Sequence, residues 1–307
     1  MNISIIGATG FLGTHLVGRL LREPQFNLSV LTRQGIDSET AKLDGHSAKL
    51  IKGDIEDFGS LVELFDSTDV IIYLAYPHRW SLSRHLAAIK NVIEAATRCN
   101  VPHIIHCSTA AVVGDVKNLV ITEDTVCKPR SEYEKIKFAI EDEFRMGCAK
   151  DINLSILRPT AIIGHGGENL QKLIGQLQND KLYINYLRSV VFGRRSLNLV
   201  CVENVVEAIL FLMQLSSSHE SGIYLISDDE AIQNNYQDVE RMLMSALDIP
   251  YYKWRKVYLP PLWLSILLRL FNKNGADPYR KFIGSKLEAL GYKKVTNIHT
   301  GITGIVQ

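Results

Sequence analysis

Tyr133 and Lys137 are the two residues whose types and spacing point most directly to chemistry. Side chains four positions apart share one face of a helix, so the lysine ammonium would lie close to the phenol. A neighbouring positive charge favours the phenolate, and we expect it to lower the pKa of Tyr133 from its usual value of about 10. Such a phenol can act as a general acid or base near neutral pH. On its own, however, the same spacing is also that of an ordinary solvated pair on a helix surface.

A segment that carries hydroxyl groups lies upstream of this pair. Cys107-Ser108-Thr109 is followed by small residues and Gly114, a pattern typical of the end of a strand. Ligands of open α/β sheets bind at the carboxyl ends of the strands. We therefore expect Thr109 to donate a hydrogen bond to a carbonyl oxygen with which Tyr133 exchanges a proton. The alternative is that Ser108 and Thr109 simply terminate a strand.

The start of the chain carries a glycine turn, Gly7-Ala8-Thr9-Gly10-Phe11-Leu12-Gly13. It follows a short apolar run at 2–6 and precedes apolar residues at helical spacing over 14–21. Glycines in this context allow a tight turn, a close approach to a pyrophosphate and close packing of helix on strand. The helix N-terminus adds unpaired N–H groups and the positive end of the helix dipole. The turn therefore predicts a dinucleotide site, and the alternative is a tight turn that binds nothing.

Strands and helices must alternate to bring these groups together. The apolar patterns predict strands at 2–6, 27–32, 48–52, 70–75, 103–107 and 154–157, and helices at 61–65, 80–99 and 132–146. They also predict helices at 171–177 and 203–215, strands at 197–202 and 222–226, a loop at 164–167 and a mostly helical remainder from Gln233. This alternation is typical of an α/β fold with a doubly wound, Rossmann-type parallel sheet.

Domain organisation follows from the same pattern. We expect a nucleotide-binding domain over 1–165, completed by about 193–226. A smaller substrate-binding lobe would consist of 166–192 and 227–307. No internal repeat or flexible linker separates the two, so we expect the lobe to be interleaved with the first domain.

Composition narrows the class of protein. The 307 residues are 46% apolar and 22% charged, and the formal net charge of +1 comes without a basic run, so nucleic acid is not an expected partner. Five cysteines are scattered singly, which favours reduced thiols in the cytoplasm over a disulfide framework or a metal site. The apolar stretch Val257 to Phe271 contains two prolines and Arg269 and is shorter than the ~20 residues of a membrane span. We expect a buried or amphipathic helix there, not a membrane contact, and no signal peptide.

Taken together, the motifs resemble those of the extended short-chain dehydrogenases/reductases, in the NAD-dependent epimerase/dehydratase group that acts on nucleotide sugars. The resemblance is strong over 1–165 and patchy beyond. It implies that Thr109, Tyr133 and Lys137 are catalytic. The cofactor-binding residues that it implies are Gly7, Thr9, Gly10, Phe11, Leu12, Gly13, Asp54, Ile55, Leu74, Ala75, Asn91, Ser108, Tyr133, Lys137 and Pro159. Weaker matches are Glu141, Arg158, Thr160, Gly164, Val202-Glu203-Asn204-Val205 and Gly222-Ile223-Tyr224.

The resemblance implies hydride transfer at a carbinol or keto carbon of a nucleotide sugar, with Tyr133 as general acid/base. Residues 76–80 (YPHRW) depart from the family pattern and place bulky aromatic groups near the approach of the substrate. Ala110-Ala111 stands where sugar dehydratases carry an Asp-Glu pair, which disfavours elimination of water.

In this family, the helices at about 81–99 and 131–148 commonly pair across a two-fold axis, which implies a homodimer. The apolar residues expected at that interface are Leu82, Leu86, Ile89, Ile93, Phe138, Ala139, Phe144 and Met146. The alternative is that both stripes are buried within the subunit.

The choice of cofactor depends on the end of the second strand. Rossmann proteins that bind NAD carry an acid about 20 residues beyond the glycines, where it holds the ribose 2′-hydroxyl. Arg33 stands 20 residues after Gly13, and no acid follows until Asp37. A guanidinium at this place suits a 2′-phosphate, so we expect NADP(H) to be favoured over NAD(H). The alternative is an exposed cation at a strand end.

Two other functions remain open. Tyr76, Trp80 and the apolar stretch 257–271 would suit a reductase or dehydrogenase of a hydrophobic alcohol or ketone, such as a steroid- or flavonoid-like substrate. A catalytically silent NADP-binding sensor or scaffold is the third possibility, and the intact Thr109, Tyr133 and Lys137 set argues against it. Four further residues could grip a diphosphate or form a solvated face: Asn169, Arg188, Arg194 and Arg195.

Overall fold

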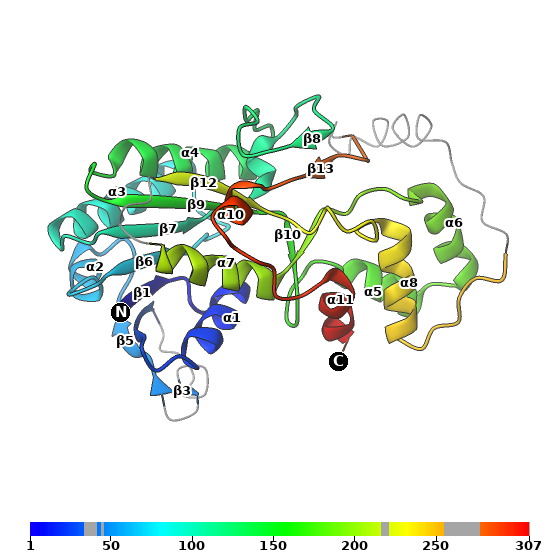
Figure 1. The fold of residues 1–307 in the computed structure, drawn as a ribbon, viewed down its shortest axis with the longest axis horizontal. Helices are drawn as coiled ribbons and strands as arrows, with labels where there is room; N and C mark the ends of the chain where they lie inside the picture. Colours follow the sequence, from blue (N-terminus) through cyan, green and yellow to red (C-terminus); the bar gives the residue numbers. More distant parts are fainter. Residues whose placement is uncertain (34–41, 44–45, 216–220, 255–276, 307) are drawn as a thin grey trace. The chain divides into compact units, whose positions relative to one another are not determined.

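The computed structural model describes residues 1–33, 42–43, 46–215, 221–254 and 277–306 (Figure 1). The apolar stretch 257–271 and Asp37 lie outside the described residues. The described residues divide into two compact units. The first consists of 1–112, 131–158 and 206–224, and the second of 113–130, 159–205 and 225–307. Residues 113–130 therefore group with the second unit, although they lie within the stretch 1–165 that the sequence assigns to one domain. The functional roles of the two units remain predictions.

A seven-stranded sheet has the strand order β12-β9-β7-β6-β1-β2-β5. The strands are β1 (Asn2–Ile6), β2 (Asn27–Thr32), β5 (Lys49–Lys52), β6 (Val70–Tyr73), β7 (His103–Cys107), β9 (Asn153–Pro159) and β12 (Gly222–Ile226). Every pair from β5 through β9 is parallel. The central strands are continuous apolar runs, as in β6, because helices cover both faces of the sheet. The predicted Rossmann-type fold is confirmed.

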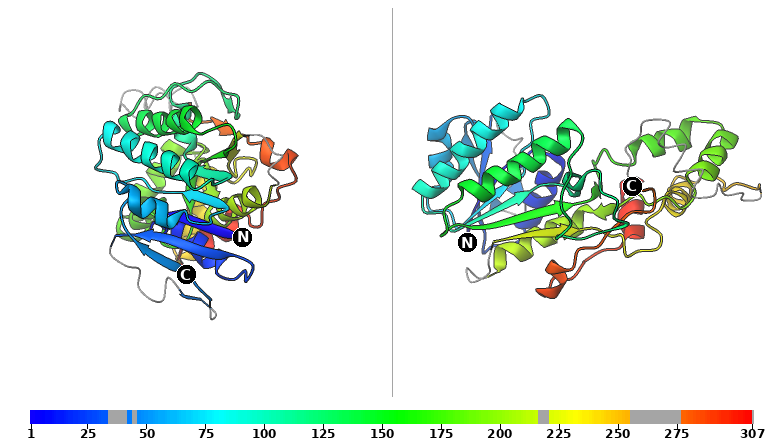
Figure 2. Two further views of the ribbon diagram at one scale, coloured as in Figure 1. Left: turned by 90° about the vertical axis from the view of Figure 1, so that its left-hand side faces the viewer. Right: turned by 90° about the horizontal axis from the view of Figure 1, so that it is seen from above.

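Helices of the first unit pack on this sheet (Figures 1 and 2). They are α1 (Phe11–Leu20), α2 (Phe58–Leu64), α3 (Leu82–Arg98), α4 (Glu132–Gly147) and most of α7 (Val202–Gln214). Asp57, Ser81 and Ser131 cap α2, α3 and α4, and Ser131 forms a capping box with Glu134. These caps fix where each helix begins. The strand predicted at 70–75 ends at Tyr73, and the chain then turns toward the next helix.

The core beside α2, α3 and α4 corrects the expected subunit interface. Ile89, Ile93 and Phe144 are all buried within the first unit, with Ile89 and Phe144 fully enclosed. They pack against strand residues of the same unit and do not face a partner. Of the other residues expected at the interface, Leu86, Phe138 and Ala139 are half-buried, while Leu82 is 42% exposed and Met146 is 78% exposed.

The second unit has its own core, formed by four helices and a short parallel strand pair. Its elements are β10 (Ala161–Ile163), α5 (Gln171–Asn179), α6 (Leu182–Phe192), β11 (Leu199–Cys201), α8 (Tyr236–Ala246) and α11 (Ile298–Val306). Shorter elements of the second unit are β8 (Val120–Ile121), β13 (Lys281–Phe282) and α10 (Lys286–Ala289). The 3-10 helix Ala110–Val113 follows β7, and in the first unit β3 (Lys42–Leu43) pairs with β4 (His46–Ser47). The helix α6 was not predicted from the sequence.

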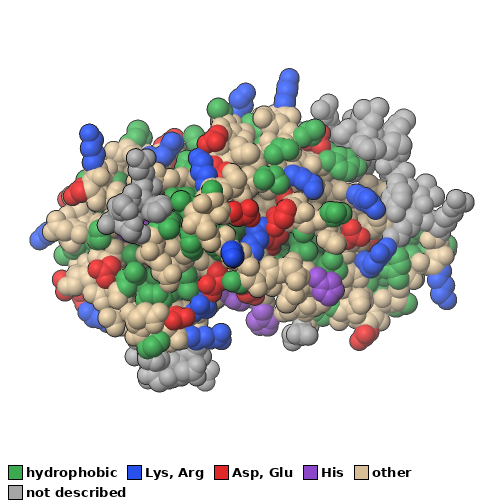
Figure 3. Space-filling model, in the orientation of Figure 1, with side chains coloured by type: hydrophobic (Ala, Val, Ile, Leu, Met, Phe, Trp, Pro, Cys, Tyr) green, Lys and Arg blue, Asp and Glu red, His purple; other side chains and the backbone are tan. Residues whose placement is uncertain are grey.

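The surface carries charges of both signs. Figure 3 shows acidic and basic side chains interspersed over the visible face, in keeping with 34 basic and 33 acidic residues. In the part of the chain that the structure describes, no helix combines the length and the hydropathy that crossing a membrane requires.

A buried ion pair joins α4 to the sheet. The Arg158 guanidinium at the end of β9 donates from Nε to Glu141 Oε1 at 3.0 Å and from its second nitrogen to Oε2 at 2.5 Å. The two side chains are 3% and 0% exposed. Because water does not reach either charge, each depends on the other for its solvation.

This pair generates a stability prediction. Glu141→Leu removes the carboxylate that pairs with the buried Arg158 charge, and should lower the free energy of unfolding by roughly 3–5 kcal/mol in urea titrations. The double variant Glu141→Leu, Arg158→Met should recover most of that loss, because no lone charge remains. Asp142→Leu is the matched control, since it removes a mostly exposed pair with Arg145 from the same helix and should cost far less. Equal losses in Glu141→Leu and Asp142→Leu would contradict this account.

Candidate active site

The glycine turn brings three segments into close contact. Gly7 has φ of +93°, which favours glycine, and a β-carbon there would lie 2.7 Å from the Ala75 nitrogen. A β-carbon on Gly13 would lie 2.3 Å from the Gly7 oxygen. At Gly10, by contrast, a β-carbon would meet only that oxygen at 3.5 Å. Gly7 and Gly13 therefore permit the packing, while Gly10 leaves open space at the N-terminus of α1, where a phosphate is favoured.

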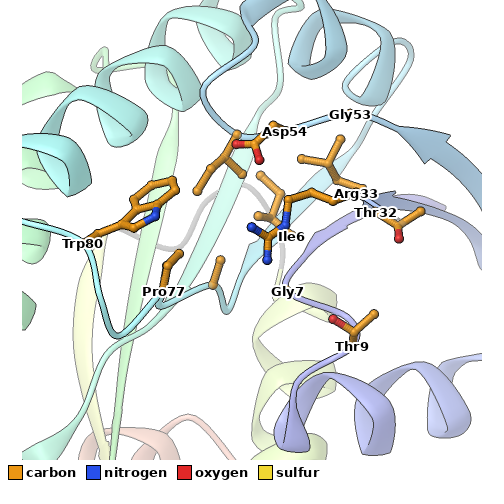
Figure 4. A pocket seen from close by; sticks show the side chains of 12 residues that line it. Ile6, Gly7, Thr9, Thr32, Arg33, Gly53, Asp54, Pro77 and Trp80 are labelled. Atoms are coloured by element: carbon orange, nitrogen blue, oxygen red, sulfur yellow. The ribbon is translucent and has the colours of Figure 1, made fainter. Parts of the chain in front are cut away.

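A pocket opens beside this turn, within the first unit (Figure 4). Its lining residues are Ile6, Gly7, Thr9, Leu31, Thr32, Arg33, Gly53, Asp54, Ile55, Ala75, Pro77 and Trp80. Six of them are predicted cofactor residues: Gly7, Thr9, Arg33, Asp54, Ile55 and Ala75. Arg33 and Asp54 lie close together in the pocket, and the Trp80 indole faces it from the other side (Figure 4). An aromatic base between an indole and a guanidinium, next to a helix N-terminus, is an arrangement that fits a dinucleotide.

The other predicted cofactor residues do not line this pocket. Gly10, Phe11, Leu12 and Gly13 form the start of α1 beside it, and Leu74 is bound through its backbone N–H to the Ile6 carbonyl at 2.9 Å. The Asn91 amide of α3 donates to the Glu56 carbonyl at 3.1 Å. Ser108 is buried at the end of β7. Pro159 belongs to the second unit.

Six pocket residues were missed by the sequence analysis: Ile6, Leu31, Thr32, Gly53, Pro77 and Trp80. The aromatic character of 76–80 was noted, but it was assigned to the approach of the substrate. The Arg84 guanidinium lies 4.1 Å from the centre of the Trp80 ring, and Arg84 forms two hydrogen bonds with the Glu56 carboxylate at 2.8 and 2.6 Å. This contact with α3 turns the indole toward the pocket.

The predicted catalytic residues converge at the ends of β7 and α4. Tyr133 lies in the first turn of α4 and forms a hydrogen bond with the Thr109 side chain. Lys137, one turn later, is buried, and its Nζ donates to the Cys107 carbonyl oxygen at 3.1 Å. The structure thus brings Thr109, Tyr133 and Lys137 to one place.

The electrostatics of this group differ from the expectation. Burial raises the pKa of Tyr133, and the hydrogen bond with Thr109 only partly opposes that shift. Burial also lowers the pKa of Lys137, because the ammonium loses its hydration. The expected lowering of the Tyr133 pKa is therefore wrong for this arrangement: loss of solvation is the largest cause of the shift, and the Lys137 ammonium binds the Cys107 carbonyl.

Of the four residues considered for a diphosphate, the structure favours one. The Arg188 guanidinium forms an ion pair with Asp180 at 2.6 Å, and the Asn169 amide donates to the Ile162 carbonyl at 2.7 Å. Arg194 is exposed. Arg195 is half-buried, burial lowers its pKa, and its guanidinium has no hydrogen-bond or ion-pair partner among the described residues.

Metal chemistry has no visible site in the described ranges. Among these residues, no group of three or more His, Cys, Asp or Glu side chains is placed to hold a metal ion.

Comparisons with known proteins agree with this geometry. The model of the NAD dependent epimerase/dehydratase family matches residues 3–227. Over 265 residues the chain is 26% identical to the N-acetyl-alpha-D-glucosaminyl-diphospho-ditrans,octacis-undecaprenol 4-epimerase of Escherichia coli O157:H7, covering 81% of this chain and 76% of that protein. It is 23% identical to a UDP-glucose 4-epimerase of Lactobacillus helveticus, with 82% and 84% covered.

The chain is also similar to proteins whose names indicate other substrates. The chain is 26% identical to a Homo sapiens sterol-4-alpha-carboxylate 3-dehydrogenase (decarboxylating), with 75% of this chain and 62% of that protein covered. The crystal structure of the Bordetella bronchiseptica enzyme WbmG in complex with NAD and UDP has a similar fold, with a TM-score of 0.69, 20% identity and coverage of 98% and 91%. Because the family model spans most of its length, the chain belongs to the NAD-dependent epimerase/dehydratase family, a group of short-chain dehydrogenase/reductase-type enzymes.

Proposed function

We propose that this protein is an NAD(P)-dependent oxidoreductase or epimerase that transfers a hydride at a carbinol or keto carbon of a nucleotide sugar. The observation that carries the proposal is the Thr109–Tyr133 hydrogen bond with the buried Lys137 ammonium one turn away. The similarity to a UDP-glucose 4-epimerase supports the substrate class. The glycine turn and the pocket beside it support the proposal that the protein binds a nicotinamide dinucleotide.

The mechanism assigns one task to each side chain. The nicotinamide, when bound, supplies the site that accepts or returns the hydride. Thr109 donates a hydrogen bond to the reacting oxygen of the substrate, and Tyr133 takes or returns the proton of that oxygen. Lys137 stabilises the phenolate that Tyr133 becomes when it has given up its proton. Burial raises the pKa of Tyr133, so the phenol is protonated at neutral pH and holds the proton that the reacting oxygen needs in the direction of reduction.

Binding of the substrate would use the second unit. Arg195 offers an unpaired guanidinium that suits the diphosphate of a nucleotide sugar, since a bidentate contact would satisfy it. The five cysteines are free thiols, which favours a reducing compartment, and we place the protein in the cytoplasm.

A second candidate substrate is a hydrophobic alcohol or ketone. The similarity to a sterol dehydrogenase favours it, as does the aromatic Tyr76 ring, whose centre lies 5.2 Å from that of Tyr133. A panel that contains both UDP-sugars and 3-hydroxysterols, each tested with NAD and NADP, separates the two. A silent NADP-binding sensor or scaffold would turn over neither.

The first prediction here concerns proton transfer. Tyr133→Phe removes the phenol and keeps the ring, so kcat should fall by roughly two to four orders of magnitude while the cofactor still binds. Steady-state kinetics on the best substrate of the panel, with cofactor binding by calorimetry, checks this. Tyr183→Phe is the control, because Tyr183 is 51% exposed on α6 in the second unit. An unchanged kcat in Tyr133→Phe would rule out the mechanism.

The second prediction concerns the choice of cofactor. We propose that Arg33 binds a 2′-phosphate, so that NADP(H) is preferred to NAD(H). Arg33→Asp should lower the ratio of NADPH to NADH affinity by at least about tenfold, or ~1.4 kcal/mol, in calorimetric titrations. Arg22→Asp changes the net charge equally at an exposed site outside the pocket and should leave the ratio unchanged. If both variants keep the wild-type ratio, Arg33 does not recognise the cofactor.

The third prediction concerns assembly. We propose a homodimer that uses the outward faces of α3 and α4, with Leu82 and Met146 in the contact. Met146→Glu should raise the dimer dissociation constant at least about tenfold in sedimentation or light scattering, because it buries a charge at the interface. Ile232→Glu is the control, since Ile232 is 77% exposed in the second unit. A wild-type protein that is monomeric at micromolar concentration would contradict the proposed homodimer.

A further inference from the structure

Tyr76 lies at the centre of an aromatic cluster beside Tyr133. Its ring stacks on the imidazole of His85 in α3, with centroids 5.0 Å apart and planes 13° from parallel. The same ring meets that of Tyr133 edge to face, at 5.2 Å and 89°. His85 in turn contacts Trp80 at 5.6 Å. The imidazole of His78 meets the Tyr76 ring edge to face at 5.1 Å, so His78, His85 and Tyr133 together fix the orientation of that ring.

The Lys137 ammonium lies over this ring. Its Nζ is 5.1 Å from the centroid of Tyr76, within the range of a cation–π contact. The Cys107 carbonyl accepts one of its three N–H groups, and no other hydrogen-bond partner is present among the described residues. The buried ammonium is thus stabilised by one carbonyl oxygen and one aromatic face, in addition to the negative charge of Glu141.

The other titratable groups around the ammonium differ in charge. Glu141 of α4 is an anion that raises the pKa of Lys137, and it is itself held in its ion pair with Arg158. The Cys107 thiol of β7 is neutral, because burial raises its pKa to about 11. His85 of α3 and His106 of β7 are also neutral near pH 7, because burial lowers the pKa of each. Glu132 and Tyr133, both of α4, act on Tyr76 itself, and Tyr133 is neutral as well.

We propose that Tyr76 is a positioning residue for the Tyr133–Lys137 pair: its ring face holds the Lys137 ammonium in place, and its contact with the Tyr133 ring sets the direction of the phenol. This inference rests on the proposed function for its consequence in catalysis. The contacts themselves are independent of which substrate is turned over. The Tyr76 ring is held from α3 by its stacking on His85. The Lys137 ammonium therefore keeps its contact with this ring when the Tyr133 side chain moves.

Two variants at this position separate the ring from its hydroxyl. Tyr76→Phe keeps the π face, and Tyr76→Leu replaces it with an apolar side chain that still excludes water. The first readout is the titration of Lys137, followed by NMR of the Cε atom in the full chain labelled with ¹³C-lysine and assigned with Lys137→Met. Tyr76→Leu should lower the titration midpoint of Lys137 by about one pH unit, because the ammonium form loses its partner. Tyr76→Phe should retain the wild-type midpoint.

The second readout is turnover. The kcat of Tyr76→Leu should be at least about tenfold below that of Tyr76→Phe, with KM values within about twofold of each other. A midpoint in Tyr76→Leu that is unchanged or raised overturns the proposal, and so does an equal shift in Tyr76→Phe. Should Tyr76→Leu fail to fold, Tyr76→Met provides the same contrast. The Lys137 titration needs no substrate, so a failure of the proposed function would appear as absent wild-type turnover with the titration contrast intact.

Discussion

The ion pair between Arg158 and Glu141 is the interaction on which the site depends most. Both charges are out of reach of water, and they join the end of β9 to the middle of α4. That helix also carries Tyr133 and Lys137, so the position of the phenol and the ammonium relative to the sheet follows from one buried contact. Such a pair contributes less to net stability than to the uniqueness of the arrangement, because an unpaired partner would be so costly.

Close backbone approach is the second constraint. Gly7 and Gly13 have no space for a β-carbon, and this brings the ends of β1 and β6 against the start of α1. The carboxyl ends of neighbouring parallel strands then form the floor of the pocket, as is usual in open α/β sheets. Together the two constraints explain why the pocket beside the glycine turn and the Tyr133–Lys137 pair lie on one edge of the same sheet.

Sequence patterns predicted the parts of the molecule that depend on local spacing. The glycine turn, the strand–helix alternation and the one-turn separation of Tyr133 and Lys137 are all periodic signals, and the structure contains each of these elements. Contacts between residues far apart in the sequence could not be predicted from such local patterns. Nothing local indicates that Trp80 faces Arg33, that Ile89 is enclosed within its own unit, or that solvation outweighs charge at Tyr133. Each depends on what lies opposite in the fold.

The turn that follows β6 has a consequence for how such an enzyme can change. Ala75, Pro77 and Trp80 line the pocket, while Tyr76, between two of them, contacts the ring of Tyr133. Neighbouring positions of this turn therefore contribute to the pocket on one side and to the surroundings of Tyr133 on the other. An insertion or deletion in this turn would change which of these side chains lines the pocket and which contacts Tyr133. The turn can therefore vary in residue type but hardly in length. For the cofactor role proposed for Arg33, redesign of specificity is better attempted from the β2 side of the pocket, apart from this turn.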